Sequence, residues 1–159
     1  MATKLHHYST LTKWTGNLGR GTSGYREYSR DYEISAEGKT SQIHGSSDRA
    51  FRGDPARYNP EELLVAGLSS CHMLWALHLC AEAGIVVTSY EDEASGEMAE
   101  NPDGSGEFTS VVLRVRMKIT DPKRVDEAKA LHERAHERCF LARSVNFRVS
   151  HEVVVTASE

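Results

Sequence analysis

Apolar and polar positions along this chain follow two different periods, and the change of period marks the elements. Between residues 111 and 119 every second residue is apolar, and the same alternation returns between 145 and 155. A period of two predicts half-buried strands. From residue 63 to residue 79 apolar side chains lie nearly all round a helical projection, which predicts a helix that is buried on most sides.

The long helix has clear start and stop signals. Asn59 is a good N-cap, Pro60 suits the first helical position, and Gly84 suits the residue just after the end. A helix from there to Ala83 has roughly 24 residues and a length of ~36 Å. A domain of this size hardly encloses such a helix alone, so we expect a homodimer that completes its burial.

Shorter elements surround it. Strands are expected roughly between Tyr8 and Ile43, with turns at 19–21 and 37–39. Within them the period-2 rule places Arg30 on the same face as Tyr28, Tyr32 and Ile34. An arginine on an apolar face needs a partner, or else its guanidinium extends into solvent at a sheet edge.

The second half of the chain predicts a hairpin, a second helix and a closing strand. Residues 101–106 (NPDGSG) have turn chemistry, and the outer arginines of the following strand can pair with the acidic run 91–93 in a solvated contact. Asp121-Pro122 opens the second helix. Its inner stripe is expected to be Val125, Ala128, Leu131 or His132, Ala135 and Cys139. There is no repeat or linker, so we expect a single domain over 1–159.

Composition narrows the class of protein. The chain has 159 residues, 39% hydrophobic and 26% charged, which is typical of a soluble globular domain, and its net charge of −4 favours neither nucleic acid nor an anionic membrane as partner. No charged segment followed by an apolar run predicts a signal peptide, and His72, His78 and Glu82 interrupt the apolar stretch 63–87, which argues against a membrane span. Three cysteines are too few for a secreted disulfide scaffold. We therefore expect a cytoplasmic protein.

Two of the cysteines have the most informative settings in the chain. Cys71 lies in the middle of the apolar helix, and Cys139 lies at the end of the second helix, on its core-facing side. Two thiols that folding brings together indicate nucleophilic or redox chemistry. Cys80 is nine positions from Cys71, on the opposite face of the same helix, and is interpreted as a small buried hydrophobe.

A mid-helix thiol gains nothing from a helix N-terminus, and burial disfavours its thiolate. A nearby cation is therefore needed, and Arg30 and Arg52 are the candidates. Glu61 is able to hold such a guanidinium in place. It also has a purely structural interpretation, because an acidic residue in the first turn stabilises the helix dipole.

A metal site is an alternative. His132, His136 and Cys139 share one helix face at i, i+4 and i+7, and His72 or Cys71 offers a fourth ligand. The same residues also suit a solvated charged face with i,i+4 pairs.

The segments Asn59-Pro60-Glu61-Glu62-Leu63-Leu64 and Ala66-Gly67-Leu68-Ser69-Ser70-Cys71-His72 resemble the central-helix signature of the OsmC/Ohr superfamily, the osmotically inducible and organic hydroperoxide resistance proteins. The position of the second cysteine and the order of elements over nearly the whole chain are similar too. The resemblance implies an α+β fold with antiparallel sheets packed around two central helices, in an intertwined homodimer, and it implies no metal or organic cofactor.

The resemblance also implies a thiol peroxidase. Cys71 would attack the hydroperoxide and become a sulfenic acid, and Cys139 would resolve it as a disulfide. Glu61 matches the family glutamate ten residues before the peroxidatic cysteine. The family arginine occupies different segments in different branches, so Arg30, Arg52 and, as a weaker third, Arg20 are candidates. A dithiol or a lipoylated protein would be the reductant.

The chain departs from the best-known branches after the second cysteine, where Phe140-Leu141-Ala142 replaces a segment that begins with proline. His72 and Trp75 are also less typical. These differences indicate a separate branch. They leave open a non-catalytic binding or stress-response protein with the same fold.

Overall fold

The structure is a computed structural model that describes residues 3–157. The described chain divides into two compact units, residues 3–63 and residues 64–157. The boundary between them falls in the first turn of the long helix that begins at Pro60. The expectation of a single domain stays a prediction.

The first unit contains a small antiparallel sheet of β1 (Leu11–Trp14), β2 (Tyr32–Ser35) and β3 (Ile43–Gly45), in that order, followed by the short 3-10 helix η1 (Arg49–Phe51). The prediction that Arg30 lies on a strand face with Tyr28 was wrong, because β2 begins only at Tyr32. Residues 25–30 form a compact loop instead. Arg30 itself closes that loop by donating hydrogen bonds to backbone carbonyls within it.

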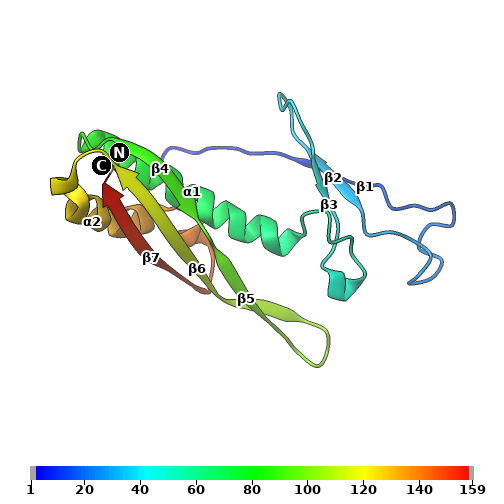
Figure 1. Ribbon diagram of the computed structural model, residues 1–159. Coiled ribbons are helices and arrows are strands. Elements are labelled where there is room, and N and C mark those ends of the chain that lie inside the picture. Colours follow the sequence, from blue (N-terminus) through cyan, green and yellow to red (C-terminus); the bar gives the residue numbers. More distant parts are fainter. Residues whose placement is uncertain (1–2, 158–159) are drawn as a thin grey trace. The chain divides into compact units, whose positions relative to one another are not determined.

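The second unit is built on a four-stranded sheet in which β6 (Gly106–Ile119) pairs with every other strand. Its partners are β4 (Val87–Asp92), β5 (Ser95–Glu100) and β7 (Arg148–Ala157). Figure 1 shows the long ribbons of β6 and β7 side by side and the hairpin of β5 and β6 projecting from the sheet. β7 runs parallel to β6, so the sheet is mixed, whereas the sequence predicted antiparallel pairing. The predicted inner face of β6 is confirmed: Val111, Leu113, Val115, Met117 and Ile119 are all buried.

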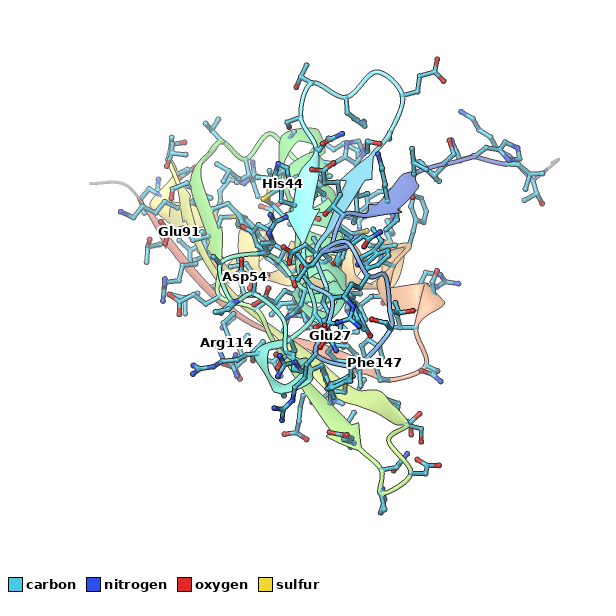
Figure 2. The ribbon with its side chains drawn as sticks, turned by 90° about the vertical axis from the view of Figure 1, so that its right-hand side faces the viewer. Glu27, His44, Asp54, Glu91, Arg114 and Phe147 are labelled. Atoms are coloured by element: carbon cyan, nitrogen blue, oxygen red, sulfur yellow. The ribbon has the colours of Figure 1, made fainter. Side chains whose placement is uncertain are left out.

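The outer face of this sheet carries the predicted charge pairs. Arg116 contacts Glu93 and Glu91, and Arg114 contacts Glu152 at 3.7 Å. Glu91 and Arg114 are both labelled in Figure 2, and their side chains are largely exposed. Exposed ion pairs of this kind contribute little to stability and indicate no active site.

The long helix begins and ends close to where its signals predict, whereas the second helix begins at Val125, three residues after the predicted start at Pro122. α1 (Pro60–Glu82) starts with a reciprocal cap: Asn59 Oδ1 accepts from the Glu62 N–H at 2.8 Å, and Glu62 Oε2 accepts from the Asn59 N–H at 3.1 Å. After it, Gly84 adopts a positive φ of 70°. α2 (Val125–Arg138) follows the 3-10 turn η2 (Pro122–Arg124), and η3 (Ala142–Ser144) precedes β7. The inner stripe of α2 is confirmed by the burial of Ala128, Leu131, His132 and Ala135.

α1 is the one helix, among the described residues, that is long and apolar enough to cross a membrane by length and composition alone. The central helix of a soluble protein has the same properties. Only 28% of its most apolar 18-residue window is buried in this chain. The residues that are buried face the sheet and α2: Leu68, His72, Ala76, Leu79 and Cys80. The remaining apolar surface of α1 must be buried by something other than the sheet and α2 of the same chain.

Candidate active site

The structure brings Cys71 and Cys139 together inside the second unit. Cys71 is half-buried in the middle of α1, and Cys139 follows α2 directly with 1% of its surface exposed. The Cys71 side chain lies close enough to the Cys139 thiol to perturb it, and neither cysteine is in a disulfide. The backbone N–H of Ala142 also donates to Cys139 Sγ at 3.4 Å. The prediction that both cysteines face the same side of the core therefore holds in the structure.

The two thiols have unequal surroundings. Burial is the main cause that raises the pKa of Cys139, to about 11, and the neighbouring Cys71 side chain adds to it. The Ala142 N–H acts in the opposite direction and offsets only part of this. Cys139 is therefore a neutral thiol at physiological pH. A neutral thiol suits a residue that reacts only after another sulfur has been oxidised. It does not suit the residue that acts as the first nucleophile.

Cys80 lies apart from this pair. It is completely buried and belongs to the hydrophobic core of the second unit, as its position on the opposite face of α1 predicts. Desolvation by burial raises its pKa. The interpretation of Cys80 as a small buried hydrophobe is confirmed.

Apolar side chains lie one helical turn to either side of Cys71. On the C-terminal side, the Trp75 ring meets the Phe140 ring edge to face, with centroids 5.8 Å apart, and 65% of Phe140 is exposed. On the N-terminal side, Leu141 lies against α1 at Gly67, where an added Cβ would be 3.3 Å from Leu141 Cδ1. The half-buried thiol is thus bordered by apolar surface that comes from two separate segments.

The candidate arginines lie in the first unit, and two of them, Arg30 and Arg52, share one aromatic side chain. Arg30 lies between the rings of Tyr25 and Tyr28, 4.4 and 4.1 Å from their centroids. It donates hydrogen bonds of 2.7 Å to the backbone carbonyls of both tyrosines. Arg52 lies 5.9 Å from the Tyr25 centroid and has a left-handed φ of 65°. Arg20, the weakest candidate, is exposed and pairs with Glu27 at 3.6 Å.

Glu61 occupies the first turn of α1, as predicted. Burial, followed by the negative charges of Glu61 and Glu62, raises the pKa of Tyr32. Glu61 is therefore near Tyr32 in the first unit. Its neighbour Glu62, and not Glu61, makes the hydrogen bond of the helix cap. This leaves the Glu61 carboxylate available for the role that the family resemblance implies.

Sequence analysis missed a cluster of histidines in the second unit. His72 Nε2 and His132 Nδ1 are 3.0 Å apart, and both residues are at most 1% exposed. The His151 ring lies 5.2 Å from that of His72 and 5.5 Å from that of His136. The sequence had grouped His132 and His136, with His72 as one option for a fourth ligand, only as a possible metal site. It did not predict the direct contact of His72 with His132, 60 residues away, or the place of His151.

The metal alternative is not supported by this arrangement. Within residues 3–157, no group of three or more His, Cys, Asp or Glu side chains has the geometry to hold a metal ion. Two of the predicted ligands, His72 and His132, do meet, but their nitrogens are 3.0 Å apart and contact each other directly.

Comparisons with known proteins agree with the fold. The family model described as OsmC-like protein matches residues 53–154. The chain is also similar to an OsmC-like protein of unknown function from Vibrio cholerae, with 32% identity over 94% of this chain and 100% of that one, at a TM-score of 0.83. The chain belongs to the OsmC-like family.

More distant solved structures share the fold and include organic hydroperoxide resistance proteins. One from Legionella pneumophila has 20% identity, covers 96% of this chain and 99% of its own, and gives a TM-score of 0.65. A putative one from Vibrio cholerae, solved with captopril in one active site, has 20% identity over 97% and 95% of the two chains, at a TM-score of 0.62. A search of curated proteins gave no match.

Proposed function

We propose that this chain is a cysteine-based peroxidase that reduces organic hydroperoxides. The observation that carries the proposal is the pair of neighbouring free thiols Cys71 and Cys139, in which Cys71 is half-buried and Cys139 is fully buried and neutral. Membership of the OsmC-like family, which has organic hydroperoxide resistance proteins among its structural neighbours, supports it.

The proposed reaction has three steps. The Cys71 thiolate attacks one peroxide oxygen, so that an S–O bond forms, the O–O bond breaks and the alcohol leaves after taking up a proton. Cys139 then attacks the sulfur of the Cys71 sulfenic acid, forming the disulfide and releasing water. An external dithiol or a lipoylated protein reduces the disulfide to two thiols and is itself oxidised to a disulfide.

The apolar border of Cys71 favours hydroperoxides with an alkyl or aryl group. Trp75 and Phe140 on one side and Leu141 on the other offer contact surface to such a group. Hydrogen peroxide has no carbon to bury there and gains nothing from these contacts. We therefore expect cumene and tert-butyl hydroperoxide to be better substrates than hydrogen peroxide in a dithiothreitol-coupled assay. No turnover of any of the three would point to a non-catalytic binding protein.

Cys139→Ser is expected to separate the first chemical step from recycling. The variant keeps Cys71, so it consumes one hydroperoxide per chain, but no disulfide forms and the sulfenic acid accumulates. A stopped-flow burst followed by a strongly reduced steady rate, with the sulfenic acid trapped by dimedone, is the predicted result. Steady turnover at the wild-type rate would remove Cys139 from the mechanism.

Arg30→Ala is expected to slow the first step about tenfold or more, as loss of one charge-stabilising donor does. Arg30 is fixed by two carbonyls and two rings, whereas Arg52 has a single distant ring contact. The measurement is the rate of Cys71 alkylation by iodoacetamide in a Cys80→Ser, Cys139→Ser background, with Arg26→Ala, at an exposed position of the same loop, as the matched control. A normal rate in Arg30→Ala together with a slow rate in Arg52→Ala would transfer the role to Arg52.

We also propose that the chain is a homodimer in the cytoplasm and that Glu61 and one candidate arginine take part in the reaction of Cys71, as the family resemblance implies. The incomplete burial of α1, with Leu74 62% exposed, supports a second copy as its cover. Light scattering behind size exclusion would test this directly. A monomer at micromolar concentration would contradict it.

A further inference from the structure

The second unit contains four imidazoles at the meeting point of α1, α2 and β7. His72 comes from α1, His132 and His136 from α2, and His151 from β7. Consecutive rings in the order His132, His72, His151, His136 have centroids 5.2, 5.2 and 5.5 Å apart. The Tyr90 ring of β4 stacks on His132 at 6.2 Å. The peroxidase chemistry proposed above uses none of these groups.

The two fully buried histidines, His72 and His132, form the central pair of this cluster. This pair is neutral, and no counter-ion is bonded to it among the described residues. Within the described chain, His72 Nδ1 and His132 Nε2, the two outer nitrogens of the pair, lack a hydrogen-bond partner. The nearest carboxylate is that of Glu133, which bonds to His151 Nε2 at 3.2 Å. Beyond Tyr90, the Asp92 carboxylate accepts from Ser69 and from a backbone N–H. A proton that binds to this pair therefore lies near other imidazoles and not near a carboxylate that is free to balance its charge.

The cluster also links the two segments that carry the reactive cysteines. His72 is the residue after Cys71 on α1. His136 is three residues before Cys139, and its carbonyl accepts the Cys139 N–H at 3.2 Å. The hydrogen bond between His72 and His132 is thus a direct polar contact between the helix of one cysteine and the helix that ends at the other.

We propose that this histidine cluster is an acid-sensitive contact between α1 and α2, whose protonation separates the two helices and with them Cys71 from Cys139. One proton leaves the bond of the central pair intact, because a charged imidazole still donates to a neutral one. A second proton places N–H against N–H, so the bond is lost and two like charges face each other in the core. Burial and the other three histidines lower the pKa of His72, which agrees with a contact that opens only in acid.

Hydrogen exchange of the wild-type chain at pH 7.5 and pH 5.0, corrected for intrinsic exchange rates, tests this directly. We expect peptides from α1 after His72 and from α2 to lose at least tenfold in protection at pH 5.0. Peptides from residues 11–45, in the first unit, should change by less than threefold. Unchanged protection of α1 and α2, or an equal loss in both units, would overturn the proposal.

Two matched variants identify the source of the effect. His72→Gln keeps a side chain that hydrogen-bonds but does not take up a proton in this range, so its loss of α2 protection at pH 5.0 should be clearly smaller than that of wild type. His78→Gln removes an exposed histidine of the same helix, which pairs with Glu82, and should behave as wild type. Loss of the acid response in His78→Gln, or a full response in a folded His72→Gln, would contradict the assignment. If His72→Gln does not fold, the wild-type exchange data decide.

Labelling of Cys139 gives an independent readout. The background is Cys71→Ser, Cys80→Ser, and the reagent is 4,4′-dithiodipyridine. We divide the labelling rate of Cys139 by the rate of glutathione at the same pH. This ratio should rise at least tenfold from pH 7.5 to pH 5.0. A constant ratio would mean that acid does not open this contact. Neither experiment uses a peroxide, so an inactive enzyme would leave both results interpretable.

Discussion

Cys71→Ser should abolish the dithiothreitol-dependent consumption of cumene hydroperoxide, leaving only the background reaction of dithiothreitol itself. A serine hydroxyl is not ionised at neutral pH and does not attack a peroxide oxygen, so no sulfenic acid forms. Cys139 does not replace it, since burial, the main cause of its raised pKa, keeps it a neutral thiol. The measurement is the hydroperoxide remaining over time at equal protein concentration.

Cys80→Ser is the matched control for this prediction. Cys80 is on the same helix and is also a free thiol, but it is completely buried in the core, away from the reactive pair. We expect its hydroperoxide turnover to stay within about twofold of wild type, with a loss of stability of about 1–3 kcal/mol from burying a hydroxyl. Equal loss of turnover in Cys80→Ser and Cys71→Ser would show that the assignment of roles by helix face is wrong.

Lowering the pH from 7.5 to 5.0 should destabilise the folded chain by about 4 kcal/mol. Burial, followed by the charges of neighbouring histidines, lowers the pKa of His72 to about 3, and burial lowers the pKa of His132 to about 4. In the unfolded chain both titrate near 6.5. At pH 5.0 the unfolded state therefore binds two protons that the folded state does not, at about 2 kcal/mol each.

The direction of these pKa shifts defines the pH range over which stability is lost. Because the folded pKa values lie below the unfolded ones, the full stability is present above about pH 6.5 and is lost as the pH falls towards the folded values. Urea unfolding at fixed protein concentration should show a midpoint about 2 M lower at pH 5.0 than at pH 7.5. His72→Gln should lose about half of this difference and His78→Gln almost none. A midpoint that is flat across this range would contradict the buried, neutral state of the pair.

The elements with a strict period could be predicted from the sequence. The alternation in β6 fixes its buried face, because a one-residue shift would expose all five apolar side chains. The bounds of α1 followed from Asn59, Pro60 and Gly84, because these residues start and end a helix through local interactions within the same segment. The meeting of Cys71 and Cys139 followed from the apolar faces of two helices that share one core.

Features that depend on contacts distant in sequence or on side-chain stacking could not be predicted. Tyr28, Arg30 and Tyr32 alternate like a strand, but the Tyr25 and Tyr28 rings stack on the Arg30 guanidinium and hold a loop there. The parallel pairing of β7 depends on the path of the chain through α2. The bond between His72 and His132 joins positions that no local pattern relates.

Disulfide mapping after a single turnover tests the central claim most directly. The reduced chain, freed of dithiothreitol, is mixed with one equivalent of cumene hydroperoxide, quenched in acid and digested for mass spectrometry. The account predicts that Cys71 and Cys139 are joined by a disulfide in most chains, with Cys80 still free and one cumyl alcohol formed per disulfide. Consumption of the hydroperoxide with both cysteines still reduced, or a disulfide that contains Cys80, would contradict it.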